Sequence, residues 1–198
     1  MAGPGTSIRN SFCLFPTAIG SCAIAWSDRG VTSVWLPEQT DPQTRARVAR
    51  RFPHIIESAP PPFVSHAIDG IVALLDGEPI DLSGVVLDET GVPEFHRAVY
   101  AIARTIAPGS TLSYGEIATR LGDPTAARAV GRALGQNPFA PIVPCHRVLA
   151  AGGTIGGFSA GGGATTKRRM LAIEQARVGD APDLFDAKRP PLRSVATS

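Results

Sequence analysis

Apolar residues near the start of the chain occur in short runs typical of β-strands. Two such runs, 22–26 and 31–35, flank residues 27–30 (SDRG), which have the composition of a hairpin turn. We therefore predict a small β-sheet over residues 11–36.

Helical spacing replaces this pattern twice in the first half of the chain. Residues 45–52 are predicted to form a short basic helix, and residues 66–75 an amphipathic helix with apolar positions three and four residues apart. Prolines 60–62 break the chain between them. The stretch 82–91 is polar and turn-like, so we place a domain junction there.

A helix with one apolar face is predicted to open the second half. Pro93 suits the first turn of a helix, and Pro108-Gly109 ends it. The predicted apolar face consists of Phe95, Val99, Ile102 and Ile106.

Two further predicted helices follow closely and match a helix-turn-helix. Ser113 and Glu116 form a capping box, which places Tyr114 in the first turn of a helix that ends near Gly122. Asp123 is the predicted cap of the next helix. The predicted buried stripe of that helix is Ala127, Val130 and Leu134.

The outer face of this last helix has the composition of a DNA-binding surface. Arg128 and Arg132 lie among the small residues Ala126, Ala129 and Gly131. Small residues let a helix backbone approach a duplex closely, and arginines can contact phosphates or enter the base stack. The alternative is an ordinary solvated face, because helix-turn-helix geometry also occurs in proteins without a DNA role.

Composition adds a charge asymmetry to this picture. The 198 residues are 43% hydrophobic and 18% charged, as in an ordinary globular protein, and the net charge is +2. Residues 1–91 hold six arginines against ten acidic residues, whereas residues 92–178 hold ten Lys or Arg against four acidic residues. A basic second half is typical of a region that contacts a polyanion, although a solvated surface can show the same excess.

Three cysteines cannot form a complete disulfide framework, and they favour a reduced compartment. Neither a run of about 18 apolar residues nor a signal-peptide pattern is present, so we expect a cytoplasmic protein without membrane contact. Cys13, Cys22, His54 and His66 could be imagined as zinc ligands. No paired ligand spacing supports a metal site, and core cysteines with surface histidines are the preferred interpretation.

The segment 142–148 (IVPCHRV) holds the candidate chemistry. Pro144 stiffens the backbone that enters Cys145. The neighbouring His146 and Arg147 give a positive field that favours a thiolate, and the imidazole can act as its base. Alternatively, Cys145 is a small buried apolar residue and His146 a satisfied core histidine.

Glycine dominates the stretch 152–163, as in a loop whose backbone approaches a ligand closely. A final predicted helix, 165–178, places Glu174 on the same stripe as Leu171. A carboxylate in an apolar stripe normally has a partner, and His146 is the predicted one.

Several of these motifs occur together in one protein family. Residues 144–148 (PCHRV), preceded by 113–118 (SYGEIA), 128–131 (RAVG) and Asn137-Pro138, closely resemble the methylated-DNA–protein-cysteine methyltransferases, or O6-alkylguanine-DNA alkyltransferases. The resemblance is strong over residues 92–178, and the order and spacing of the motifs make it specific. The N-terminal hairpin is only loosely similar to that family.

This resemblance implies four residues that carry the chemistry. Cys145 corresponds to the alkyl acceptor, and His146 to the base that removes its proton through a water. Glu174 corresponds to the acid that orients and charges the imidazole. Asn137 corresponds to the residue that ties the recognition helix to the active-site turn.

The resemblance also implies a set of residues that bind DNA and the damaged base. Tyr114 corresponds to a tyrosine that helps rotate the nucleotide and donates a hydrogen bond to the departing guanine, and Arg128 to an arginine finger that fills the gap in the stack. Ser159 corresponds to a loop contact with guanine O6, and Val148 to a backbone contact with the base. The full set predicted to bind DNA or base is Tyr114, Ala127, Arg128, Gly131, Val148 and Ser159.

The implied function is DNA repair by irreversible transfer of a methyl or other alkyl group from O6-alkylguanine in double-stranded DNA to Cys145, once per molecule and without a cofactor. The expected fold is α+β, with a small N-terminal β-sheet domain that includes a helix and a mainly helical C-terminal domain that contains the helix-turn-helix. We expect domains at 11–90 and 91–178, flexible ends at 1–10 and 179–198, and a monomer.

Two other functions stay open at this point. An alkyltransferase-like lesion-binding protein would flip the damaged base without transfer, but such relatives lack the acceptor cysteine that Cys145 supplies here. A sequence-specific transcription regulator would need a dimerisation element, and we find none in the sequence. A stoichiometric transfer assay separates the three functions.

Overall fold

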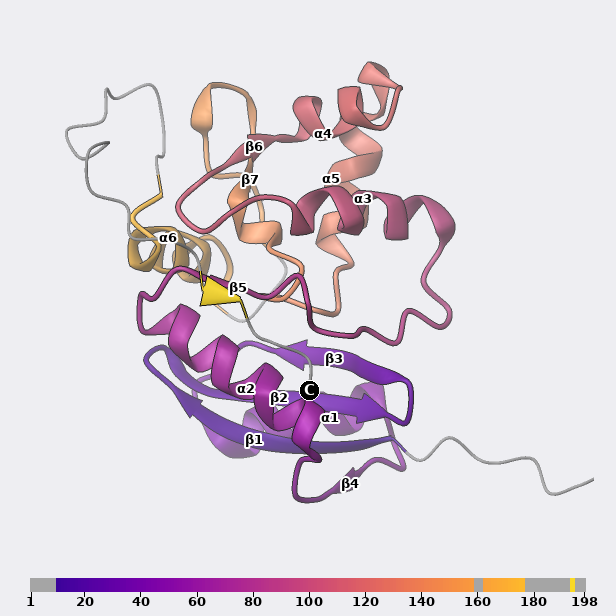
Figure 1. The fold of residues 1–198 in the computed structure, drawn as a ribbon, viewed down its shortest axis with the longest axis vertical. Coiled ribbons are helices and arrows are strands. Elements are labelled where there is room, and N and C mark those ends of the chain that lie inside the picture. The colour runs from indigo at the N-terminus through magenta and orange to yellow at the C-terminus, as the bar shows by residue number, and fades with distance from the viewer. Residues whose placement is uncertain (1–9, 159–161, 177–192, 195–198) are drawn as a thin grey trace, which may run out of the picture.

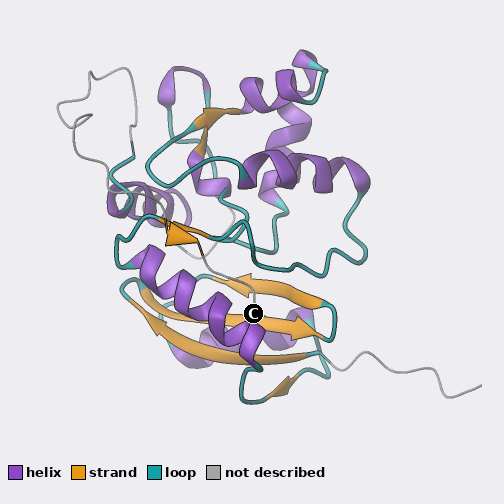
Figure 2. Ribbon diagram, in the orientation of Figure 1, coloured by secondary structure: helices purple, strands orange, loops and turns teal. Residues whose placement is uncertain are grey.

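The computed structural model describes residues 10–158, 162–176 and 193–194. Its first half contains a sheet of four strands in the order β3-β2-β1-β4 (Figures 1 and 2). The strands are β1 (Ser11–Thr17), β2 (Gly20–Ser27), β3 (Gly30–Trp35) and β4 (Ile56–Glu57). The first three form an antiparallel meander, and β4 pairs with β1 in parallel, so the predicted N-terminal sheet is confirmed.

A helix covers each face of this sheet. Ile24 of β2 packs in the cluster that includes α2 (Pro62–Leu75), and the next residue, Ala25, packs in the cluster that includes α1 (Asp41–Arg51). This alternation follows from the period of two along a strand. Figure 1 shows α2 in front of the strands and α1 behind them.

Both helices begin earlier than predicted. α1 begins at Asp41 because Thr40 and Gln43 form a capping box, and Pro62 is the first residue of α2 instead of part of the break. The spacing of apolar residues indicates only the buried turns of a helix. The prediction therefore missed first turns that are polar or proline-rich.

The second half is mainly helical. Its longer elements are α3 (Glu94–Arg104), α4 (Tyr114–Arg120), α5 (Ala127–Gly135) and α6 (Gly163–Ile173). The short elements are β6 (Leu112–Ser113), η1 (Pro124–Ala126), η2 (Cys145–Arg147), β7 (Val148–Leu149), η3 (Ala151–Gly153) and β8 (Arg193–Ser194), and β5 (Ile80–Asp81) precedes them in the first half. β6 and β7 pair in parallel, as do β5 and β8.

The buried face of α3 differs from the predicted one. Val99 and Ile106 are buried, but Phe95 is 38% exposed. Tyr100 is buried instead, because its hydroxyl donates to the Ala133 carbonyl at 3.0 Å. The prediction counted only aliphatic residues and phenylalanine as apolar. It therefore left out Tyr100 and placed the buried face of α3 too close to Phe95.

The capping box of α4 is present, but the helix after it begins differently from the prediction. Ser113 accepts from the N–H of Glu116, and Glu116 accepts from the N–H of Ser113. Asp123 caps the 3₁₀ turn η1, from which the chain continues into α5. On α5, Val130 and Leu134 are buried as predicted, whereas Ala127 is only half-buried and Ala133, which was not predicted, is buried in the helical core.

The segment between the two halves lies along the edge of the sheet. The Val31 N–H donates to the Val86 carbonyl at 3.0 Å, and the Asp88 N–H donates to the Val31 carbonyl at 2.8 Å. Gly30 has φ +145°, and a Cβ there would lie 2.7 Å from the Val86 oxygen. Only glycine permits this close approach.

Direct contacts also join the halves. The Val34 N–H of β3 donates to the Pro138 carbonyl at 2.7 Å. Arg169 of α6 donates to the Ala18 carbonyl, in the turn between β1 and β2, at 2.6 Å. The sheet therefore contacts two different segments of the helical half.

The predicted flexible segments 1–10 and 179–198 fall outside the described residues, except for Asn10 and residues 193–194. In the part of the chain that is described, no helix has the length and apolar character needed to cross a membrane.

Candidate active site

The candidate nucleophile lies in a short buried turn. All residues from 139 to 149 are buried, and Cys145, at the start of η2, is 7% exposed. Its N–H donates to the Val143 carbonyl at 2.8 Å, which holds the turn closed.

The environment of the Cys145 thiol differs from the expected one. Burial raises the pKa of the thiol, and a hydrogen bond from Asn137 and the charge of Lys167 lower it only in part. The thiol is therefore predominantly protonated near neutral pH, and a base must remove its proton before it can attack. The positive charge that acts on it comes from Lys167, not from the neighbours expected in the sequence.

His146 and Glu174 form the predicted pair. His146 Nε2 lies 2.8 Å from Glu174 Oε1, and the two side chains are 0% and 3% exposed. Burial lowers the pKa of His146 and outweighs the opposing effect of Glu174. Nδ1 of His146 is buried and has no hydrogen-bond partner among the described residues. One ring nitrogen is thus held by the carboxylate, and the other is free to accept a proton.

Glu174 also binds Arg147. Arg147 Nε donates to Oε2 at 2.8 Å, and Nη2 donates to Oε1 at 2.9 Å. Burial alone would raise the pKa of Glu174, but the charges and hydrogen bonds of His146 and Arg147 hold it well below its usual range. Glu174 is therefore a carboxylate at any physiological pH.

Asn137 connects α5 to the turn that carries the thiol. It follows the last turn of α5, and its Nδ2 donates to the Val143 carbonyl at 2.8 Å. Its Oδ1 accepts from the Phe139 N–H at 2.9 Å, and its side chain is hydrogen-bonded to Cys145. A shift of α5 would therefore be transmitted to the sulfur.

Tyr114 lies between α5 and the glycine-rich loop. A Cβ added to Gly131 would lie 3.9 Å from its ring, and one added to Gly156 would lie 3.3 Å from its hydroxyl. A Cβ at residue 156 would therefore crowd the phenol hydroxyl, whereas one at residue 131 would only make ordinary contact with the ring. Burial, and to a lesser extent the charge of Cys145, raise the pKa of Tyr114, so its hydroxyl remains a hydrogen-bond donor.

Lys167 is a residue of this site that the sequence analysis missed. It is fully buried, its Nζ donates to the Val148 carbonyl at 2.6 Å, and Nζ lies 5.9 Å from the centroid of the Tyr114 ring. A signal was available, because Lys167, Leu171 and Glu174 follow one another at spacings of four and three residues. The reasoning that singled out a carboxylate in this stripe applies equally to the lysine.

The Lys167→Met variant is expected to raise the pKa of Cys145 further and to reduce the thiolate population at neutral pH. Methionine has similar length but removes the charge that lowers the pKa of this thiol. A titration of ¹³Cβ-labelled cysteine by NMR measures the change. Arg168→Met removes an exposed charge from the same helix and should leave the titration unchanged. A parent-like titration of Cys145 in Lys167→Met would contradict the prediction.

The remaining predicted residues occupy different surroundings. Arg128 is exposed on α5 with Arg132, whereas Ala127 is half-buried against the helical core. Val148 lies in β7 directly after the turn of Cys145, and its carbonyl already accepts from Lys167. Ser159 lies outside the described residues.

Among the described residues, no three His, Cys, Asp or Glu side chains lie close enough to hold a metal ion. Cys22 is buried and Cys13 half-buried, and burial raises their pKa values to about 12 and about 11. His54 and His66 are exposed. These positions agree with core cysteines and surface histidines.

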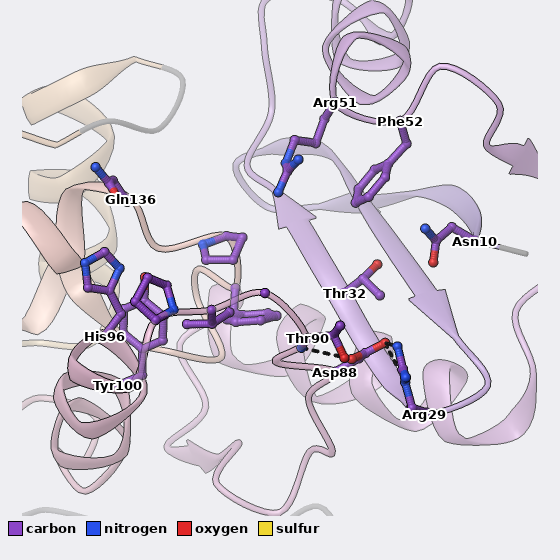
Figure 3. Close-up of a pocket in the computed structure, with 15 residues that line it drawn as sticks. Asn10, Arg29, Thr32, Arg51, Phe52, Asp88, Thr90, His96, Tyr100 and Gln136 are labelled. Carbon is purple, nitrogen blue, oxygen red and sulfur yellow. Dashed lines mark hydrogen bonds and ion pairs between the residues drawn. The ribbon is translucent and has the colours of Figure 1, made fainter. Parts of the chain in front are cut away.

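A cavity of about 450 Å³ lies at the junction of the two halves (Figure 3). Burial opposes the ionisation of Asp88 in its wall, but hydrogen bonds from Thr90, Ser27 and Arg29 lower the pKa to about 2. None of the predicted site residues that the structure describes lines this cavity. Pro138 and Phe139 do, so the cavity borders the segment that directly follows Asn137.

The candidate active site lies in a region of the chain that is similar to known proteins. The family described as "6-O-methylguanine DNA methyltransferase, DNA binding domain" matches residues 94–176. A methylated-DNA–protein-cysteine methyltransferase of Mycolicibacterium paratuberculosis is 37% identical over 168 residues, 85% of this chain and 94% of the relative. The protein of the same name from Methanothermobacter thermautotrophicus is 35% identical over 151 residues, 76% of this chain and 77% of the relative.

A solved structure extends the similarity to the whole fold. The crystal structure of Mycobacterium tuberculosis OGT in complex with DNA has a TM-score of 0.68 and 36% identity, and the match covers 86% of this chain and 96% of that chain. The similarity therefore includes both the N-terminal sheet and the helical half.

Proposed function

Since this chain belongs to the methylated-DNA–protein-cysteine methyltransferase family, we propose that it repairs DNA by transferring a methyl or other alkyl group from guanine O6 to Cys145. The buried arrangement of Cys145, His146 and Glu174 carries this proposal. A hydrogen-bonded imidazole and carboxylate beside a protonated thiol are the groups that activation of a sulfur nucleophile requires.

In the proposed reaction, Nδ1 of His146 takes the thiol proton through a water. The Cys145 sulfur then attacks the alkyl carbon, the carbon–O6 bond breaks, and its electron pair leaves with the guanine. Tyr114 donates a hydrogen bond to the departing base, which stabilises the charge that develops on it. The product is a thioether that cellular thiols do not reduce, so each molecule acts once.

The proposed partner is double-stranded DNA that contains O6-alkylguanine. We assign α4 and α5 to a helix-turn-helix, because a short turn joins them and α5 exposes Arg128. The target base must leave the stack to reach a buried thiol, at a cost of a few kcal/mol, and Arg128 would fill the gap. Gly131 leaves room beside Tyr114, and Ala127 lies on the turn of α5 that precedes it.

The same proposal assigns the remaining expected contacts. The Val148 carbonyl accepts one hydrogen bond from Lys167 and keeps a second lone pair for the base. Ser159 follows Phe158 in the loop and is assigned to guanine O6. One thiol and one recognition helix suffice for the reaction, so we propose a monomer. The free thiol that the reaction uses favours a reduced compartment, so we propose the cytoplasm.

Mass spectrometry of the protein after incubation with methylated duplex DNA tests this function. We expect one added methyl group, in the peptide that contains Cys145, and no further turnover. Modification of another residue, or turnover beyond one equivalent, would overturn the proposal. Tight binding to the lesion without any modification would instead identify a lesion-binding protein.

Arg128→Ala is expected to slow transfer from duplex DNA by about tenfold to a hundredfold, because the flipped state loses the side chain that fills the stack. Transfer from the free base O6-methylguanine should change little, since no stack has to be opened. Arg50→Ala, which removes an exposed arginine from α1, is the matched control. Single-turnover rates with both substrates provide the measurement, and parent-like rates of Arg128→Ala on duplex would disprove the finger role.

A further inference from the structure

Two consecutive side chains converge on one carboxylate in this site. His146 Nε2 and Arg147 Nη2 both contact Glu174 Oε1, at 2.8 Å and 2.9 Å. Arg147 Nε donates to Oε2 at 2.8 Å, and the Gly109 N–H adds a contact to Oε2 at 3.4 Å. Arg147 Nη1 donates to the Ile106 carbonyl, which fixes the plane of the guanidinium.

The position of Glu174 is unfavourable for a negative charge without this support. Glu174 directly follows the last residue of α6, where the helix dipole is negative, and its side chain is 3% exposed. The side chain of Arg147 is 7% exposed, so it contacts the carboxylate and not solvent or DNA. The guanidinium is therefore the cation that offsets both the helix end and the loss of water.

The protons of the His146–Glu174 pair have three possible arrangements. A carboxylate can accept from a neutral ring protonated on Nε2, a carboxylic acid can donate to a ring protonated on Nδ1, or a carboxylate can pair with an imidazolium. Only the first arrangement leaves a lone pair on Nδ1. Because Nδ1 is the nitrogen without a partner among the described residues, only the first arrangement lets the ring act as a base toward the thiol.

We propose that Arg147 is a positioning residue that selects the first arrangement and thereby makes Nδ1 of His146 the basic atom of the site. Its two hydrogen bonds stabilise the carboxylate against the carboxylic acid, and its charge repels an imidazolium. The other charged or titratable groups that act on His146 are Glu174, which favours the imidazolium, and Lys167, which opposes it. The role of Nδ1 as the base for the thiol rests on the proposed function. The assignment of the ring proton to Nε2 does not depend on that function.

NMR of ¹⁵N-histidine-labelled protein tests the assignment directly, because long-range proton–nitrogen spectra identify the protonated ring nitrogen. In the parent we expect His146 to be neutral at pH 7 and protonated on Nε2. In Arg147→Gln we expect Nδ1 to carry a proton in most molecules, through either of the other two arrangements. Arg147→Lys keeps the charge but loses the paired hydrogen bonds of the guanidinium, so its fraction protonated on Nδ1 should lie between those of the parent and Arg147→Gln. Arg168→Gln, which replaces an exposed residue of α6, should match the parent.

Single-turnover transfer measured from pH 5.5 to 9 supplies the second readout. Arg147→Gln should lose on the order of a hundredfold in rate at pH 6.5, the range that general-base catalysis contributes. The acid limb of its profile should move to higher pH, because loss of the guanidinium makes the imidazolium easier to form. If Arg147 had a purely structural role, its replacement would lower the folded fraction but leave the acid limb of the pH–rate profile in place.

Two outcomes would overturn the inference. One is a parent spectrum in which Nδ1 of His146 carries the proton. This result would overturn the assignment even if no transfer is observed. The other is a folded Arg147→Gln with the parent tautomer and the parent pH profile. If Arg147→Gln does not fold by circular dichroism, Arg147→Lys takes its place, and a parent-like tautomer and profile in that variant count against the inference.

Discussion

Cys145→Ser is expected to abolish alkyl transfer and to leave binding to methylated duplex DNA within about twofold of the parent. The serine hydroxyl fits the space of the thiol, but it ionises far less readily than a thiol and is a weaker nucleophile. His146 would then face an acid too weak to deprotonate near neutral pH. Radiolabelled methyl transfer and fluorescence anisotropy on the same duplex measure the two properties separately.

Cys13 supplies the control for this result. Cys13→Ser, at a half-buried position in β1, should transfer one equivalent as the parent does, because Cys13 lies in the N-terminal sheet and not in the turn that carries His146. Residual transfer by Cys145→Ser, or a loss of transfer in Cys13→Ser, would show that the acceptor has been wrongly assigned.

Glu174→Gln is expected to have the largest effect on stability, with about 3–5 kcal/mol lost from the free energy of unfolding. The amide leaves Arg147 as a buried cation without a counter-charge, and it replaces one of the two oxygens that accept from His146 and Arg147 with an NH2 group that cannot accept. For a chain of this size the loss corresponds to a fall in melting temperature of roughly 10 °C. Transfer should slow on the order of a hundredfold, because the base loses its orientation.

The pH dependence of this effect has a defined sign. The pKa of Glu174 is lowered in the folded protein, so its contribution is fully present above the unfolded pKa of about 4.3 and is lost as the pH falls below it. The stability difference between parent and Glu174→Gln should therefore shrink in acid. Denaturant titrations at pH 7 and pH 3.5 measure it, with exposed Glu78→Gln as control. An equal stability difference between parent and Glu174→Gln at pH 7 and at pH 3.5 would contradict the role of the ionised carboxylate.

The parts of the fold that the sequence predicted are those set by local patterns. The alternation of apolar residues and the turn before Gly30 predicted the sheet, and Ser113 with Glu116 predicted the start of α4. Errors were of two kinds: the polar or proline-rich first turns of α1 and α2 were missed although their signals are local, and the buried face of α3 was wrong because a tertiary contact decides it. Phe95 was placed in the core because nothing local shows that Tyr100 bonds to α5.

The candidate site shows the same division. The pairing of His146 with Glu174 was predicted, because a lone carboxylate in an apolar stripe requires a partner. The roles of the site residues and the domain boundary at 90/91 stay predictions. Lys167 was missed because only the carboxylate of its stripe was considered, and only the folded chain shows Val148 and Tyr114 around its ammonium.

The hydrogen bond from Val34 to Pro138 limits how this protein could be recombined with its relatives. In a chimera with a foreign amino-terminal half, the new edge strand would have to present an N–H at this register, since a slip of one residue turns that group to the opposite side. Exchange of the halves would therefore require an edge strand that keeps this register opposite residue 138.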